Sequence, residues 1–127
     1  MKAVQNAYLN TSVMTASQRK LVVLIFEAAV RYLMQAKEKI KEKDYAQKGI
    51  LISKAMDCIA ELDNSLNLKK GGELAKNLHA IYFYCQTRLL QANLHLDNQK
   101  IDEVISILKN IGSAFAEIEE KQTTQSA

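Results

Sequence analysis

The chain has 127 residues, with hydrophobic residues at 48%, charged residues at 24%, four glycines and no proline. This length and balance predict one globular domain with a single core, and the missing proline favours an all-helical fold. The net charge of +3 arises from 17 basic and 14 acidic residues that are interspersed along the chain. That excess is weaker than the basic stripe of a nucleic-acid-binding surface, so we expect no nucleic-acid partner.

The first 14 residues are polar with scattered apolar side chains and are predicted as an N-terminal arm or short helix. The letters TAS at 15–17 open the first long helix, because Thr15 with Gln18 fits a capping box and Ser17 is an alternative N-cap. This helix is predicted to run to about Lys43. Its expected core face follows a spacing near 3.6 and consists of Leu21, Ile25, Ala28, Ala29, Tyr32, Ala36 and Ile40.

Three more helices follow the same kind of pattern. The second is capped by Asp44 and ends near Leu66, with core positions Tyr45, Ile52, Ala55, Met56, Ile59, Leu62 and Leu66. The third spans about Glu73 to Leu96, with Leu74, Leu78, Ile81, Tyr82, Cys85, Leu89 and Ala92 on one face. The fourth spans about Ile101 to Glu120, through Val104, Leu108, Ile111, Phe115 and Ile118.

The tail 121–127 lacks apolar side chains apart from its last alanine and is predicted to be disordered. Short connections between four helices predict an antiparallel up-and-down four-helix bundle over residues 15–120, with the arm 1–14 in front. No run approaches the roughly 18 apolar residues of a membrane span, and the N-terminus lacks the apolar core of a signal peptide. We therefore expect a cytoplasmic protein with no membrane insertion.

Two adjacent glycines, Gly71 and Gly72, stand in the stretch KKGGEL. A phosphate loop or a dinucleotide-binding loop needs a different glycine spacing after a strand. Glu73 would also repel a phosphate at the start of the next helix, while it suits the helix dipole. The pair is therefore predicted to be a structural joint, with Gly71 at positive φ and Gly72 as the N-cap of the third helix.

Two helices carry more apolar residues than a bundle core needs. On the third helix, Phe83, Leu90 and Leu94 lie almost opposite the core face. The first helix has a similar second stripe of Val23, Phe26, Val30 and Met34. The pattern leaves two interpretations open. Either a homodimer, the arm or neighbouring helices cover these stripes, or together they form a docking groove for an amphipathic partner helix.

The segment SLNLKKGGELAKNLHAIYFY at 65–84 resembles the central motif of the FliS family of flagellar secretion chaperones. NAY at 6–8, TAS followed by LVVLIFEAAVRYL, and QANLHLDNQKIDEVISIL are similar to other family segments in the same order, so the resemblance covers about residues 4–118. It implies a cytosolic chaperone that binds the C-terminal segment of flagellin, prevents premature polymerisation and delivers the client to the flagellar export gate, without a cofactor. It favours the groove, with client-binding residues Tyr8, Val23, Phe26, Val30, Phe83, Leu90 and Leu94.

Two other functions compete with this one. Arg88 and His95 fit the loose Arg-x6-His spacing of HEPN helical ribonucleases and toxins, although Leu89 stands where those enzymes place a polar residue. A helical adaptor with an unrelated client is the other alternative. We expect no catalytic residues, because no nucleophile motif is present. We also expect no metal site, because two cysteines and two histidines at these spacings cannot supply its ligands.

Overall fold

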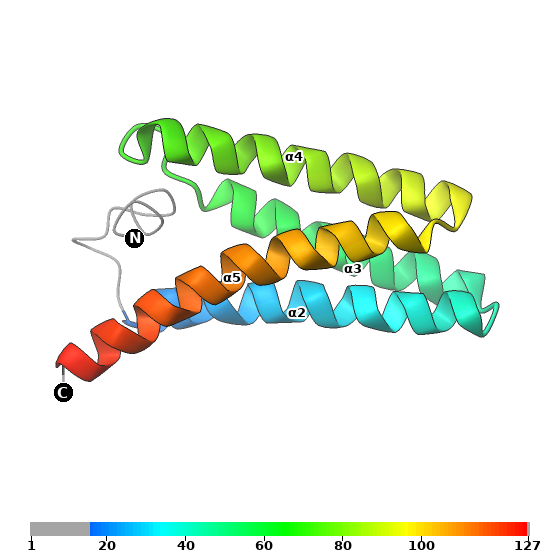
Figure 1. Cartoon of the computed structure of the whole chain (residues 1–127), viewed down its shortest axis with the longest axis horizontal. Coiled ribbons are helices and arrows are strands. Elements are labelled where there is room, and N and C mark those ends of the chain that lie inside the picture. The colour runs from blue at the N-terminus through cyan, green and yellow to red at the C-terminus, as the bar shows by residue number, and fades with distance from the viewer. Residues whose placement is uncertain (1–15, 127) are drawn as a thin grey trace.

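The computed structural model describes the backbone of residues 16–126 and the side chains of residues 16–117. In this part of the chain it contains four helices and no strand: α2 (Ala16–Lys41), α3 (Tyr45–Asn64), α4 (Gly72–His95) and α5 (Asn98–Ser126). Consecutive helices run in opposite directions (Figure 1). The predicted all-α, antiparallel up-and-down bundle is confirmed.

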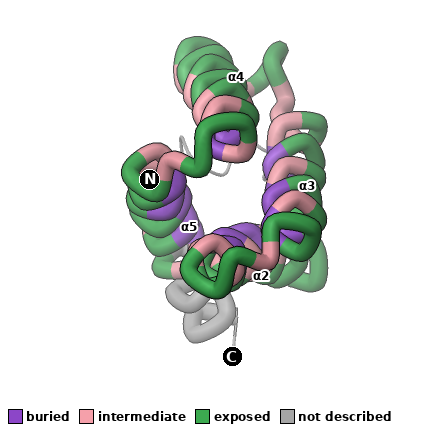
Figure 2. The backbone as a smooth tube through the Cα atoms, turned by 90° about the vertical axis from the view of Figure 1, so that its right-hand side faces the viewer, coloured by how far each residue is buried: buried purple, intermediate pink, exposed green. Residues whose placement is uncertain are grey.

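The four helices form a ring around the core. Each helix packs against the one before it, and α5 closes the ring by packing on α2. Viewed along the bundle, α4 lies across the core from α2 (Figure 2). The packing between α2 and α3 is the most extensive, whereas α4 contacts both of its neighbours less. α4 is therefore the most peripheral helix.

The core is apolar and includes Tyr82 and Phe115 as its largest fully buried side chains. On α4 the predicted face is largely correct, since Leu78, Tyr82, Cys85, Leu89 and Ala92 are buried. On α3, the predicted core positions Ile52, Ala55, Ile59 and Leu62 are buried as well. Tyr45 is an exception: it is the first residue of α3 and is exposed, with its ring beside the Lys48 ammonium.

The predicted core face of α2 is only partly correct: Ala29 and Ala36 are buried, and Ile25, Tyr32 and Ile40 pack half-buried against the core. Leu21 is exposed, and the buried residues are Val22, Phe26, Ala29, Leu33 and Ala36. Both registers have helical spacing, so periodicity alone could not separate them. The observed register buries Phe26 and Leu33, which remove more apolar area from water than Ala28 and Leu21 would.

The joint between α2 and α3 is a tight C-terminal cap. Lys43 has φ 62°, its N–H donates to the Ile40 carbonyl, and the Asp44 N–H donates to the Lys39 carbonyl. This is the pairing of a Schellman motif, which ends α2 at Lys41 rather than at Lys43. Asp44 is the predicted N-cap of α3, and its carboxylate accepts a hydrogen bond from the Gln47 N–H at 3.2 Å.

The glycine pair is a joint, but its two members exchange the predicted roles. Gly72 has φ +55°, while Gly71 has φ −79° and is the residue that precedes α4. Only glycine adopts a φ such as that of Gly72 without strain. The chain therefore turns into α4 at Gly72. α3 itself ends at Asn64, before the predicted Leu66.

The remaining boundaries also differ in part. α5 begins at Asn98, because the Asp97 carboxylate accepts hydrogen bonds from the N–H groups of Gln99 and Lys100. Its backbone stays helical to Ser126, beyond the predicted end near Glu120. α2 begins at Ala16, which places Ser17 inside the first turn rather than at the N-cap. Thr15 lies outside the described residues. The division into arm, bundle and tail stays a prediction.

Candidate functional site

The outer side of α4 carries an apolar face that consists of Phe83, Leu90 and Leu94. Their exposed fractions are 69%, 53% and 70%. The spacing i, i+7, i+11 places all three on the side of the helix opposite the buried Leu78, Cys85 and Leu89. Large apolar side chains that line up along one helix in this way mark an interaction surface more often than scattered single residues do.

A second apolar surface is a pocket of about 290 Å³ between α2 and α5. Three residues of the predicted α2 stripe meet there: Val23 and Val30 are half-buried, and Phe26 is only 2% exposed. Phe26 is thus a core residue that forms one wall, and its predicted place on an exposed stripe is wrong. Met34, the fourth member of that stripe, is exposed outside the pocket. The other lining residues are Glu27, Arg31, Leu108, Lys109, Gly112, Ser113 and Ala116.

Gly112 lets α5 approach α2 at this pocket. A Cβ atom at position 112 would lie 2.9 Å from the Cβ of Phe26, closer than real Cβ contacts allow. The α5 side of the pocket was not predicted from the sequence. A glycine inside a strong helical pattern was the available signal, because such a residue costs helix stability and usually has a packing reason.

The two apolar surfaces do not form one groove. Figure 2 places α4 across the core from α2, so the outer face of α4 and the α2–α5 seam lie on different sides of the bundle. The interpretation that the stripes of these two helices form a single docking groove, which the family resemblance favoured, is wrong. A partner that uses both surfaces must extend around the molecule.

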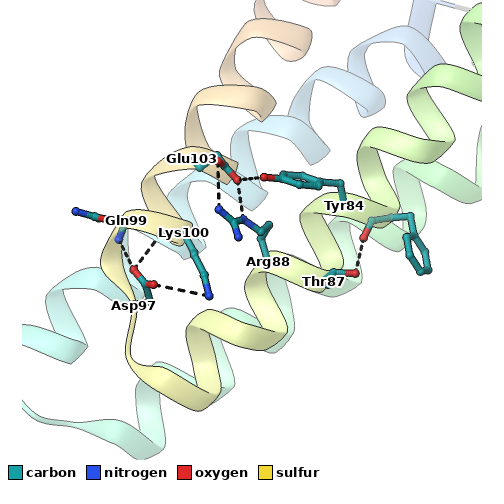
Figure 3. Close-up of polar contacts among 8 residues, drawn as sticks. Tyr84, Thr87, Arg88, Asp97, Gln99, Lys100 and Glu103 are labelled. Carbon is teal, nitrogen blue, oxygen red and sulfur yellow. Dashed lines mark hydrogen bonds and ion pairs between the residues drawn. The ribbon is translucent and has the colours of Figure 1, made fainter.

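A polar cluster ties α4 to α5 beside the apolar face (Figure 3). The Tyr84 hydroxyl donates to Glu103 at 2.6 Å, and the Arg88 Nε donates to the same carboxylate at 2.8 Å. The Arg88 guanidinium also lies 5.4 Å from the centroid of the Tyr84 ring. Hydrogen bonds from Arg88 and then from Tyr84 lower the pKa of Glu103 below its ordinary value.

On its other side, α4 is held to α3 by polar contacts. His79 Nδ1 lies 2.7 Å from an Asp63 carboxylate oxygen, and the Gln86 side chain donates to the Met56 carbonyl at 2.8 Å. Together with the Glu103 cluster, these contacts fix the rotation of α4 about its own axis. That rotation decides whether Phe83, Leu90 and Leu94 point away from the core.

The arrangement does not bring Arg88 and His95 together. They stand seven positions apart on one helix, about 10 Å along its axis, and the Arg88 guanidinium forms an ion pair with Glu103. Among the described residues, no three His, Cys, Asp or Glu side chains cluster as metal ligands would. Burial raises the pKa of the Cys85 thiol to about 11, which makes it a poor nucleophile.

Tyr8, the remaining predicted client-binding residue, lies outside the described residues. Within residues 16–126, no helix combines the length and apolarity needed to cross a bilayer.

A small antiparallel bundle with two exposed apolar surfaces belongs to the class of helical binding proteins. The comparison with known families narrows this class. A family model described as flagellar protein FliS matches residues 1–122, so the chain belongs to the FliS family of flagellar secretion chaperones. This is a chaperone family and not a class of enzymes.

Individual relatives from this family are similar to the chain over most of their length. A flagellar secretion chaperone FliS of Salmonella typhimurium is 38% identical over 126 residues, covering 98% of this chain and 93% of the relative. A flagellar secretion chaperone FliSB of Pseudomonas aeruginosa is 34% identical and covers 91% of each chain. A FliS of Vibrio cholerae is 31% identical, covering 93% of this chain and 87% of the relative.

Proposed function

We propose that this chain binds the C-terminal segment of flagellin in the cytoplasm, keeps it from polymerising early and delivers it to the flagellar export gate. The single observation that carries the proposal is the exposed apolar face of α4 in a protein of a flagellar chaperone family. The described core is complete without Phe83, Leu90 and Leu94, so these side chains are free to contact a client.

The physical logic suits a disordered amphipathic client. Each large side chain that becomes fully buried contributes roughly 1.5–3 kcal/mol before the cost of ordering the client is subtracted. One apolar face alone therefore gives modest affinity. The α2–α5 pocket is a second anchor point, and a disordered segment that engages both surfaces wraps around the bundle and gains affinity without new contacts at either site.

Arm 1–14 is part of this proposal. Its apolar residues Val4, Tyr8, Leu9 and Met14 follow near-helical spacing, yet the arm is too short to form a stable helix alone. We infer that the arm covers part of the client-binding surface through Tyr8 until a client displaces it. Such a competition lowers the apparent client affinity by the fraction of molecules in which the surface is open.

A copurification from the native cell tests the proposal against its competitors. We expect flagellin to be the main protein captured with this chain. An unrelated protein as the dominant partner would identify a helical adaptor instead. RNA cleavage by the purified chain that disappears in both Arg88→Ala and His95→Ala would establish the ribonuclease alternative. A homodimer is tested by the same preparation, through its mass in solution before and after flagellin is removed.

A further inference from the structure

Lys48 is a buried cation that the proposed client binding does not use. It is 7% exposed and is the only charged side chain in the buried class among the described residues. Its ammonium lies 3.0 Å from the Asn93 carbonyl oxygen and 6.0 Å from the centroid of the Tyr45 ring. No described carboxylate forms an ion pair with it. Taking an ammonium out of water is costly, so the contact with Asn93 must compensate for that cost.

Asn93 lies in the last turn of α4, and that position makes its carbonyl a strong acceptor. The last four carbonyls of a helix lack partners inside the helix. They also carry the partial negative charge of the helix dipole, equivalent to about half an elementary charge. The Ala92 carbonyl is already used, because it accepts from the N–H groups of Leu96 and Asp97. Lys48 therefore supplies from α3 a donor and a compensating positive charge that the end of α4 lacks.

The same contact fixes the axial position of α4 relative to α3. Lys48 belongs to the first turn of α3, which is itself fixed by the Asp44 cap. Beside it, Gly49 faces Asn93: a Cβ at position 49 would lie 3.9 Å from the Asn93 side-chain oxygen, which is an ordinary contact. Leu94 follows Asn93 in the same turn and Leu90 stands three residues before Asn93, so a shift of this end of α4 displaces both.

We propose that Lys48 is a positioning residue for client binding: it clamps the last turn of α4 and thereby holds Leu90 and Leu94 in their binding arrangement. A buried methionine would fill a similar volume without losing hydration, so stability alone does not call for a lysine here. The part of the proposal that concerns the client rests on the proposed function. The clamp itself can be tested without a client.

The test compares three variants. Lys48→Met removes the charge and the donor but keeps the apolar stem, and Lys48→Arg retains a cationic donor. Lys54→Met is the matched control, because Lys54 stands on the same helix and its ammonium lies over the Tyr32 ring on the surface. Amide hydrogen exchange at Leu96 and Asp97, whose N–H groups form the α4 cap, reports the clamp in the free protein. Calorimetric titration with a flagellin C-terminal peptide reports its effect on binding.

For Lys48→Met we expect exchange at Leu96 and Asp97 to accelerate about tenfold, as losing a hydrogen bond from a charged donor would predict, while the amides of α2 keep their protection. Peptide affinity should fall by a similar factor. Lys48→Arg should restore most of both losses, and Lys54→Met should change neither.

Unchanged exchange in Lys48→Met would overturn the clamp, and so would faster exchange throughout the bundle, because Lys48 would then serve general stability. Local acceleration without loss of peptide affinity would overturn the positioning role. If no flagellin peptide binds even the wild type, the proposed function fails, whereas the exchange data still decide the clamp.

Discussion

At the scale of single residues, two backbone positions with positive φ end helices without glycine. Lys43 has φ 62° and closes α2, while Leu96 has φ 54° and closes α4. A non-glycine residue in this region carries a steric cost between its Cβ and the backbone. Lys43 stands two positions past the end of α2, and Leu96 stands one position past the end of α4. Glycine is the usual choice at such positions. The fold therefore tolerates strain at two of its three joints.

Lys43→Gly should stabilise the protein. Relief of the left-handed strain predicts a gain of about 1 kcal/mol in the free energy of unfolding, measured by chemical denaturation. Lys41→Gly is the matched control, because Lys41 is the last residue of α2 and has helical geometry. That change should lower stability by up to about 1 kcal/mol. Equal destabilisation by the two substitutions would show that Lys43 is not strained.

The residues of the two apolar surfaces differ in how far periodicity could predict their exposure. Phe83, Leu90 and Leu94 were correctly predicted to be exposed, because α4 has one clear core face and these residues oppose it. Phe26 was misassigned, because α2 has two apolar stripes of similar periodicity. The choice between them depends on which stripe meets α3 and α5, and that information is absent from the α2 sequence itself.

At the scale of elements, α4 is held by polar contacts on both sides, while α2 has the largest apolar packing with α3. The Glu103 carboxylate joins α5 to two α4 side chains, Tyr84 and Arg88. The existence and order of the four helices were predictable from periodicity and turn residues. The polar contacts between α4 and its neighbours were not, because each joins residues 15 to 30 positions apart whose facing depends on helix rotation.

The Glu103 contact predicts a specific dependence on pH. Because the folded-state pKa of Glu103 is lowered, its ionised form stabilises the native state above the pKa of the unfolded chain, ordinarily about 4.3. This contribution is lost as the pH falls through the folded-state pKa. Glu103→Gln should therefore lower the melting temperature at pH 7, and the difference from wild type should shrink below about pH 4.

A series of thermal melts between pH 7 and pH 3 checks this expectation. Glu73→Gln is a suitable control, because the ion pair of Glu73 with Lys76 lies within α4 and does not join two helices. A difference between Glu103→Gln and wild type that stays constant down to pH 3 would show that the carboxylate charge does not stabilise the contact between α4 and α5.

At the scale of the whole molecule, the two apolar surfaces lie on different sides of the bundle (Figure 2). A rigid helical partner could cover only one of them. A disordered segment can reach both, and that is the kind of client that we propose. Because the two surfaces are separate, an arm that covers one of them, as we propose for residues 1–14, leaves the other open.

The role of the arm predicts a change in exchange behaviour. Amide hydrogen exchange should show protection of residues 4–14 in the free protein and a clear loss or change of that protection when the client binds. A docked arm must leave its surface or rearrange before the client can use it. Equally rapid exchange of these amides in both states would show that the arm covers nothing.

Binding of the client by the apolar face of α4 can be tested in one calorimetric experiment. A flagellin C-terminal segment is titrated into wild type, Leu90→Asp and Leu24→Asp. Leu90 and Leu24 are the same residue type with matched exposed fractions of 53% and 52%, but only Leu90 belongs to the α4 face. Both variants should keep the helix content and melting temperature of the wild type. Leu90→Asp should abolish binding, and Leu24→Asp should bind as the wild type does. Full affinity in folded Leu90→Asp, or an equal loss in both variants, would contradict binding through the α4 face.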